Sequence, residues 1–418
     1  MSKVKNLQGE GVRQLNRSYI LKQIREQGPI TKIALANYLS LTFAAVSNIV
    51  ADLVKLNVIK EVGYGESEGG RPPVLYDMNW NSIHVIAVDI GVEHISAAEI
   101  DLKARVIEET TVDTQGAPLI ERVYTVIDQL LERRTNDSVK IAGIGVSAPG
   151  PIDARDGRML TPPNMEGVSN IDIKYLLEDR YGLTTVLEKD ANASALAEQW
   201  FGHVTTDEDI LYIFNDVGLG GGLIINARVH RGFGNGAGEI GHMAIDIDGP
   251  RCNCGNFGCL EALSSGIAIQ RRVKEEIRRG YPTTLEEAFV RNEKALTIDL
   301  IINHAKQGDQ LAKHILDEAG RYLGLGVANA INLFAPDQVI FGGSVTVLYP
   351  EMIKIAEHVA KQRTFSPFSE RITFAQSKFH KQSNLVGAAA VIQQRLFDYP
   401  EGAFFLKVDR VVLSTSVH

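Results

Sequence analysis

Apolar residues recur at helical spacing through the first sixty residues and predict three short helices, NRSYILKQIREQG, TKIALANYLSL and TFAAVSNIVADLVKLNVIKEVG. Gly28-Pro29 ends the first helix, and the hydroxyl of Thr31 is placed to cap the second. The third helix spans about Thr42 to Lys55. Its predicted buried face consists of Val46, Ile49, Val50 and Leu53.

Two short apolar segments after the third helix predict a β-hairpin, with strands at Val58 to Val62 and Val74 to Asp77. The intervening GYGESEGGRPP supplies a flexible tip. Three helices followed by a hairpin are typical of a winged helix-turn-helix, which reads DNA with its third helix and supports it with the wing. The same pattern also fits a dimerisation module with a solvated basic face. The candidate DNA contacts are Thr42, Phe43, Ala44, Ser47, Asn48 and, toward a minor groove, Arg71.

From about Ile83 the pattern changes to buried strands, and two segments resemble each other. VIAVDIGVEHISAAEIDLKARVI and LYIFNDVGLGGGLIINARVHRG both pass from an apolar strand through an acidic, glycine-containing turn into a second apolar strand. This duplication predicts an α/β body of two lobes, with ligands in the cleft between them. LVGAAAVIQQRLF predicts a late helix that returns to the first lobe. The expected domains are 1–80, 81–190 together with about 383–418, and 191–382.

Length and composition fit a protein of two or three domains with a sizeable core, since 44% of the 418 residues are hydrophobic. No apolar run reaches the length that spans a bilayer, and no signal-peptide pattern is present. We therefore expect a cytoplasmic protein without a membrane partner. The formal net charge is −8, yet residues 1–60 carry nine Lys or Arg against three acidic residues. This asymmetry favours a polyanion as the partner of the N-terminal segment alone.

All three cysteines of the chain lie in the run GHMAIDIDGPRCNCGNFGC, together with one histidine. Three thiolates and an imidazole complete the tetrahedral shell of a structural metal, and the glycines between them allow tight turns. Ordinary buried thiols beside a histidine are the alternative, since cysteine is often buried. The sequence predicts Zn²⁺ as a structural cofactor, with the ligands His242, Cys252, Cys254 and Cys259.

Three longer segments together resemble the ROK family of sugar kinases and sugar-responsive repressors. They are EKDANASALAEQWFG, GEIGHMAIDIDGPRCNCGNFGCLEALSSG and ANAINLFAPDQVIFGGSV, and the resemblance runs over essentially the whole chain. It implies an actin-like (ribonuclease H-like) ATPase fold after the winged helix-turn-helix, with a sugar bound in the interlobe cleft. The N-terminal segment points to the repressor branch, whose members respond to xylose, N-acetylglucosamine or glucose.

The resemblance also implies sugar contacts. Asp190 matches the kinase base toward the sugar hydroxyl, although a carboxylate can equally accept a hydrogen bond without catalysis. Lys189 replaces an Asn of the kinases, and Asn164 is also explained as an ordinary turn residue beside proline. If one ring nitrogen of His242 binds the metal, the other is fixed toward the cleft. The candidate sugar-binding residues are Asn164, Lys189, Asp190, Glu239, His242 and Glu261.

The phosphate-binding motifs of the kinases are altered. Where kinases have Asp-X-Gly-Gly-Thr, this chain has DIGVE at 89–93; where they have Gly-Thr-Gly, one residue and three glycines, it has DVGLGGG at 216–222. Two added carboxylates near a triphosphate oppose its binding by roughly several kcal/mol before screening. Because phosphoryl transfer depends on positioning and charge neutralisation, the sequence predicts a protein that is not an enzyme.

The predicted function is therefore repression of sugar-utilisation genes, with a sugar in the cleft setting the affinity for operator DNA. We expect a homodimer, with further pairing of dimers left open, and DNA half-sites spaced by whole helical turns. Two alternatives remain: an ATP-dependent sugar kinase that has kept a DNA-binding segment, and a docking platform for a protein partner. The segment after Pro400 carries no pattern that assigns it a role.

Overall fold

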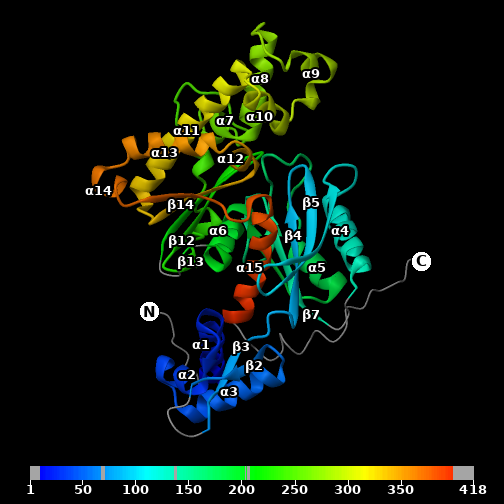
Figure 1. Cartoon of the computed structure of the whole chain (residues 1–418). Helices are drawn as coiled ribbons and strands as arrows, with labels where there is room; N and C mark the ends of the chain where they lie inside the picture. Colours follow the sequence, from blue (N-terminus) through cyan, green and yellow to red (C-terminus); the bar gives the residue numbers. More distant parts are fainter. Residues whose placement is uncertain (1–9, 67–70, 136–138, 203, 205–207, 399–418) are drawn as a thin grey trace, which may run out of the picture.

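The computed structural model describes residues 10–66, 71–135, 139–202, 204 and 208–398. A small N-terminal unit, blue in Figure 1, lies beneath a larger body with two sheets. The unit combines three helices with an antiparallel sheet in the order β1-β3-β2. Its elements are α1 (Glu10–Gln27), β1 (Ile30–Thr31), α2 (Lys32–Leu39), α3 (Phe43–Lys55), β2 (Ile59–Tyr64) and β3 (Val74–Met78).

Threonine caps begin both α2 and α3. Thr31 Oγ1 accepts a hydrogen bond from the Ala34 N–H at 3.1 Å, and Thr42 Oγ1 accepts one from the Ala45 N–H at 3.2 Å. The capping role predicted for Thr31 is thus confirmed. Both strands of the predicted hairpin are present close to their predicted positions. The predicted inner face of α3 is buried in the core of the unit: Val46, Ile49, Val50 and Leu53.

Two features of the N-terminal unit differ from the sequence-based expectation. The first helix begins at Glu10, before the predicted segment that starts at Asn16. Val12 and Leu15 in the added turns are each 45% exposed, so the buried periodicity does not reach them. In addition, Ile30–Thr31 pairs with β3 as a third strand, which is too short to show an alternating pattern.

The first sheet of the body has the order β10-β7-β4-β5-β6. β4, β5 and β6 are antiparallel neighbours, whereas β7 runs parallel to β4, and β10 runs parallel to β7. Helix α4 (Leu119–Arg133) packs on β5 and β6, and α5 (Ile173–Tyr181) on β10. The strands, with a small hairpin β8–β9, are β4 (Ile83–Ile90), β5 (His94–Asp101), β6 (Val106–Asp113), β7 (Lys140–Ala148), β8 (Ile152–Asp153), β9 (Arg158–Met159) and β10 (Thr185–Lys189).

The second sheet repeats this plan in the order β13-β12-β11-β14-β15. An antiparallel group of three strands is again joined to two parallel ones. The predicted duplication is confirmed, because β4–β5 and β11–β12 are equivalent hairpins at the centres of the two sheets. The strands are β11 (Ile210–Asn215), β12 (Leu219–Ile225), β13 (Arg228–Val229), β14 (Gln338–Gly342) and β15 (Thr373–Gln376).

Helices surround the second sheet and extend beyond it at the top of Figure 1. The long helix α11 packs against α13, and together they contribute much of the largest apolar core. The helices are α6 (Asp190–Phe201), α7 (Leu260–Ser264), α8 (Gly266–Arg278), α9 (Glu286–Arg291), α10 (Ile298–Lys306), α11 (Gln310–Phe334), α12 (Ser344–Leu348), α13 (Glu351–Arg363) and α14 (Ser366–Ser369). No helix of the described residues is both long and apolar enough to cross a membrane.

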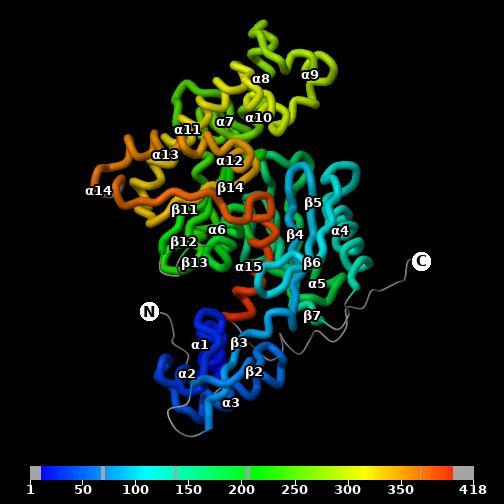
Figure 2. The backbone as a smooth tube through the Cα atoms, in the orientation of Figure 1, coloured from blue at the N-terminus to red at the C-terminus, as the bar shows by residue number. Residues whose placement is uncertain are grey.

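Helix α15 (Ser383–Asp398) runs between the two sheets, shown in red-orange in Figure 2. It packs against α6, β4 and β7, which confirms the predicted return to the first lobe. Its end reaches α1: Ser18 Oγ donates to the Phe397 carbonyl at 2.5 Å, and Lys22 pairs with Asp398. On the same side, the Arg25 guanidinium lies 3.8 Å from the ring centroid of Trp200 in α6. The expected continuation of the first lobe over 399–418 lies outside the described residues.

Candidate functional site

The two sheets meet at a cleft with a volume of about 240 Å³. The β4–β5 turn, the β11–β12 turn, the loop at 162–164 and the junction of β10 with α6 form its walls. The structure therefore brings together side chains from distant parts of the sequence. All six candidate sugar-binding residues line the cleft: Asn164, Lys189, Asp190, Glu239, His242 and Glu261.

The junction of β10 with α6 fixes Asp190 in the cleft. Lys189 is the last residue of β10, and Asp190 opens α6, where its Oδ1 accepts from the Ala191 N–H at 2.6 Å. Small side chains allow α6 to lie directly against β12. A Cβ atom at Gly222 would come within 2.2 Å of the Ala191 carbonyl oxygen, so only glycine fits there. The start of α6 is consequently held against the second sheet.

Lys189 forms an ion pair inside the cleft. Its Nζ donates to the Ala237 carbonyl at 3.0 Å and to Glu239 Oε1 at 3.1 Å, and the side chain is only 4% exposed. Because an ammonium group has three N–H donors, one remains for a ligand oxygen. The second oxygen of Glu239 can accept from a neighbouring hydroxyl. The pair therefore offers one donor and one acceptor side by side, a combination that suits two adjacent hydroxyl groups.

Three carboxylates influence one another in the cleft. Burial, together with the charges of Asp190 and Asp216, raises the pKa of Asp89 to about 7, against hydrogen bonds from Asn384 and Ser147. Burial also raises the pKa of Asp190 to about 7, against the opposing charge of Lys189. Asp216 is held differently, since Ser344 Oγ donates to its Oδ1 at 2.7 Å. The charge of the cleft therefore changes with protonation close to neutral pH.

A compact cluster of histidine and cysteine side chains adjoins the cleft. The donor atoms of His242, Cys252, Cys254 and Cys259 all lie within 4.8 Å of one another, and the cysteines are free thiols. His242 directs Nδ1 at the cluster, 3.9 Å from Cys252 Sγ. Since His242 also lines the cleft, Nε2 is the ring nitrogen left for a ligand there. Three sulfurs and one imidazole nitrogen form a donor set that could hold a metal ion.

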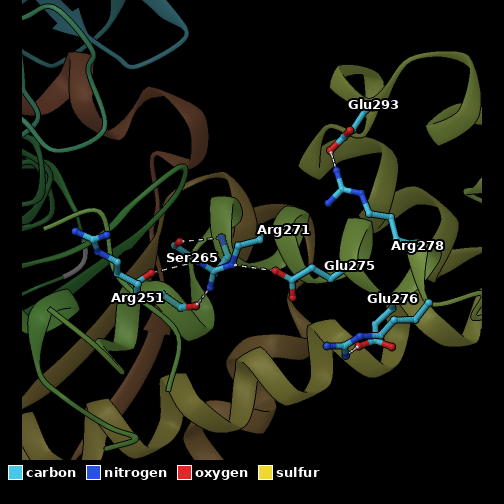
Figure 3. A network of polar contacts seen from close by, with 10 residues as sticks. Arg251, Ser265, Arg271, Glu275, Glu276, Arg278 and Glu293 are labelled. Carbon is cyan, nitrogen blue, oxygen red and sulfur yellow. Dashed lines mark hydrogen bonds and ion pairs between the residues drawn. The ribbon is translucent and has the colours of Figure 1, made fainter. Parts of the chain in front are cut away.

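The loop that carries the cysteines is braced on two sides. Gly258 adopts φ +63°, and a Cβ atom there would come within 1.6 Å of the Asp246 carbonyl oxygen, so glycine is required for the fold of the loop. Arg271 of α8, which lies beside Arg251 in Figure 3, donates to the Arg251 carbonyl at 3.3 Å. It also donates to the Ala262 carbonyl at 2.7 Å. These contacts fix the loop to α7 and α8.

The same loop connects the cluster to both walls of the cleft. Glu261 accepts from the Leu219 N–H at 3.0 Å through Oε2, and the Cys252 thiol lies 3.6 Å from its Oε1. Asn253, between two of the cysteines, donates to Asn164 Oδ1 at 2.8 Å. Asn164 lines the cleft, so this hydrogen bond joins the cysteine loop to the loop at 162–164. The geometry of the cluster and of the cleft are thereby linked.

Sequence reasoning missed His94, Phe214 and Asn384, which also line the cleft. Asn384 stands at the start of α15 and accepts from Ser194 Oγ at 2.7 Å. The returning helix was predicted from the apolar run that begins at Leu385, and Asn384 lies one residue before that run. The one available signal was a polar pair, Ser383 and Asn384, directly before the apolar run.

The candidate DNA contacts lie on the N-terminal unit, well away from the cleft. Phe43 is 54% exposed, which is unusual for an aromatic residue and leaves its ring free for contact with a partner. Arg71 is exposed in the β2–β3 connection, just before β3. On α3, Ser47 is half-buried, and the remaining candidates are its cap Thr42 and the exposed Ala44 and Asn48.

The model of the ROK family matches residues 85–395, which include both sheets and the cleft. The chain belongs to the ROK family. Among curated ROK-like relatives, it is 29% identical over 398 residues to the xylose repressor of Caldicellulosiruptor bescii, covering 94% of this chain and 98% of the relative. It is 29% identical over 397 residues to the DNA-binding transcriptional dual regulator NagC of Escherichia coli K12, covering 93% and 94% respectively.

Solved structures support the same assignment. A ROK family transcriptional regulator described as a homolog of the Escherichia coli MLC protein superposes with a TM-score of 0.81 at 28% identity, covering 95% of this chain and 99% of the other. A ROK family glucokinase from Streptomyces griseus, solved with glucose and AMPPNP, gives a TM-score of 0.66 at 28% identity and covers 74% of this chain and 99% of its own. The body thus has the fold of ROK sugar kinases.

Proposed function

We propose that this ROK protein is a sugar-responsive transcriptional repressor. One observation carries the proposal: a chain that resembles repressors over more than nine-tenths of its length combines an exposed helix face with a cleft of hydrogen-bonding side chains. The relatives are named for xylose and N-acetylglucosamine. We infer that a sugar binds in the cleft of this chain too, through the six residues that line it.

In this proposal the N-terminal unit is a winged helix-turn-helix. The exposed face of α3, with Phe43 and Asn48, enters the major groove, and Arg71 on the wing approaches a minor groove. The excess of basic over acidic residues before residue 60 supports attraction to DNA phosphates. Because the N-terminal unit lies away from the cleft, DNA and sugar would bind at separate sites, as allosteric control requires.

The proposed metal is a structural zinc ion. His242, Cys252, Cys254 and Cys259 would hold it in a closed tetrahedral shell, which leaves no open position for a substrate. Zinc would there supply only rigidity, while His242 Nε2 and Glu261 contact the sugar from a loop that the ion keeps in place. The contacts of Asn253 and Arg271 described above support this role, because they tie the loop to both walls.

Control of DNA binding would pass through α6. This helix begins with Asp190 in the cleft and carries Trp200 near its other end, where Arg25 of α1 lies over the indole. Movement of α6 when the lobes close around a sugar would therefore displace α1. A sugar shifts this equilibrium only by its difference in affinity between the two arrangements.

The domain bounds, the cellular location and the oligomeric state are also part of the proposal. We propose domains at 1–80, 81–190 with about 383–418, and 191–382, a cytoplasmic location, and a homodimer that places two winged helices on one operator. Its α/β body would serve no catalytic role, since carboxylates at 93 and 216 replace the threonine and the first glycine of the two kinase phosphate motifs.

Fluorescence anisotropy of the protein on its own upstream DNA, titrated with xylose, glucose and N-acetylglucosamine at fixed salt, tests the proposal. Release of the DNA by one sugar supports it. Tight binding that no sugar changes would favour a protein partner as the effector, and absence of DNA binding would overturn the repressor function.

The similarity to a glucokinase structure favours one second candidate, an active sugar kinase. ATP-dependent phosphorylation of any of the three sugars, lost in Asp190→Asn, would establish it. We expect no turnover, because the added carboxylates repel the phosphates of ATP.

A further inference from the structure

A second cavity, which we call the side groove, opens beside the cleft on the first lobe. It has a volume of about 820 Å³ and lies between the β6–α4 connection at 114–120 and the loop at 164–171. Val92 and Asn164 line both the cleft and the side groove. The two cavities therefore adjoin at these two side chains.

The wall shared by the two cavities is fixed by hydrogen bonds. Thr114 donates through Oγ1 to the Gly91 carbonyl and through its N–H to the Glu93 carbonyl, each at 2.9 Å. The end of β6 is thus fastened to the β4–β5 turn. Val92 stands in this turn, where the kinases have a glycine, and its side chain faces the two cavities. The side groove is accordingly positioned relative to the cleft by the sheet itself.

The chemistry of the side groove suits a sugar ring. Its floor is apolar, with Leu119 and Met165 buried and Val168 half-buried, while Gln115 and Glu166 at the rim are exposed. A pyranose ring has apolar C–H faces and a polar edge of hydroxyls, which match such a floor and rim. The lining contains no Lys or Arg, so it offers no partner for a phosphate or a carboxylate.

Asn164 stands where the side groove adjoins the cleft. Asn164 Oδ1 already accepts from Asn253, which fixes the side chain at the point where a ligand would pass between the cavities.

We propose that the effector is an oligosaccharide whose terminal ring binds in the cleft and whose next ring lies in the side groove. The proposal rests on the sugar-binding function of the cleft and specifies the class of sugar. It predicts that the second ring adds affinity, since its apolar face is buried on the floor formed by Met165 and Val168.

Isothermal titration calorimetry with three matched pairs tests the proposal: xylose and xylobiose, glucose and cellobiose, N-acetylglucosamine and chitobiose. We expect one disaccharide to bind at least tenfold more tightly than its monosaccharide. Val168→Trp places an indole ring on the floor of the side groove, where the second ring would bind. It should remove most of this advantage while leaving the affinity for the monosaccharide within about twofold. Val290→Trp makes the same change on α9, where Val290 is 77% exposed, and should alter neither affinity.

The outcomes separate the side groove from the proposed function. If a monosaccharide binds and releases DNA but no disaccharide binds more tightly, the side groove is not a sugar subsite and the repressor function stands. If Val168→Trp weakens the binding of the monosaccharide and the disaccharide equally, the side groove is likewise not a sugar subsite. Failure of all six sugars both to bind and to release DNA would overturn the two proposals together.

Discussion

Asp89 is a buried carboxyl group of the cleft. Within the described part of the chain its Oδ1 is buried with no hydrogen-bond partner, and its pKa of about 7 lies well above the usual 3.8. The folded protein therefore retains this proton at pH values where the unfolded chain has lost it. The stabilisation is complete below pH 3.8 and disappears as the pH rises to about 7.

Asp89→Asn should consequently stabilise the protein more at high pH than at low pH. We expect the gain in the free energy of unfolding to be roughly 2 kcal/mol larger at pH 8 than at pH 5, measured by urea unfolding without ligand. Asp156→Asn alters an exposed carboxylate and serves as the control. A gain in Asp89→Asn that does not depend on pH would show that Asp89 is already ionised in the folded protein.

Cys254→Ser should release the metal that we assign to the His/Cys cluster. A serine hydroxyl is a poor ligand for zinc, so we expect bound zinc to fall well below one per chain and the unfolding temperature to drop by several degrees. Elemental analysis after gel filtration measures the first effect and thermal melting the second. Asn256→Ser changes an exposed residue of the same loop and should keep the metal. Full zinc in Cys254→Ser would remove Cys254 from the ligand set.

Residue chemistry decided which site residues the sequence could predict. The cysteines were recognisable because all three fall within one short loop, and the structure places them together with His242. Lys189 and Asp190 were found through the motif at the junction of β10 with α6. Asn384 was missed because it lies just before the apolar run from which the returning helix was predicted, and no motif marks it as part of the cleft.

Among the elements, α6 has contacts at both ends that would link sugar binding in the cleft to DNA binding by the N-terminal unit. Trp200 packs edge-on against Phe397 at 5.5 Å and lies beneath the Arg25 guanidinium. A cation–π contact contributes about 0.5–2 kcal/mol, comparable with a typical allosteric coupling energy of 1–3 kcal/mol.

Trp200→Leu should therefore uncouple DNA release from sugar binding. We expect sugar affinity in calorimetry to stay within about twofold, while the sugar-induced loss of operator affinity in anisotropy shrinks at least threefold. Phe365→Leu, at a side chain that is 66% exposed, controls for loss of an aromatic ring. Full release of DNA in Trp200→Leu would rule out α6 as the route.

Substitutions in the proposed wing and in the cleft should change operator affinity and sugar affinity separately. Arg71→Ala is expected to weaken operator binding by about tenfold and to leave the sugar affinity unchanged, because Arg71 lies on the wing. Glu239→Gln should do the reverse, since it disturbs the ion pair with Lys189 and removes a charged acceptor. Anisotropy and calorimetry on both variants give the four values needed. An effect of Arg71→Ala on sugar affinity alone would contradict the assignment of the wing.

At the element scale, prediction succeeded where a pattern is local. Caps, an apolar stripe and the duplicated hairpins gave the helices of the N-terminal unit and the centres of both sheets. It failed for Ile30–Thr31, whose strand character comes from pairing with β3, and for the start of α1, where Val12 and Leu15 face solvent. Tertiary pairing and exposure leave no periodic signal in such short stretches.

For the whole molecule, the proposed dimer predicts how DNA is covered. Two symmetric winged helices should protect two half-sites separated by whole turns of about 10–10.5 base pairs. Hydroxyl-radical footprinting on the upstream DNA, with light scattering to establish the mass of the complex, checks this. Protection of a single half-site by one chain would contradict the dimer.

The chain has two tryptophans, and their positions give it a built-in optical probe. Trp200 lies against Arg25, and Trp80 follows β3 at the link to the body, with the Lys103 ammonium 4.9 Å from its ring centroid. Both indoles thus report on the junction between the N-terminal unit and the body, and neither lines the cleft. The intrinsic fluorescence of the unlabelled protein should therefore change only when a bound effector moves that junction, which distinguishes a ligand that signals from one that merely binds.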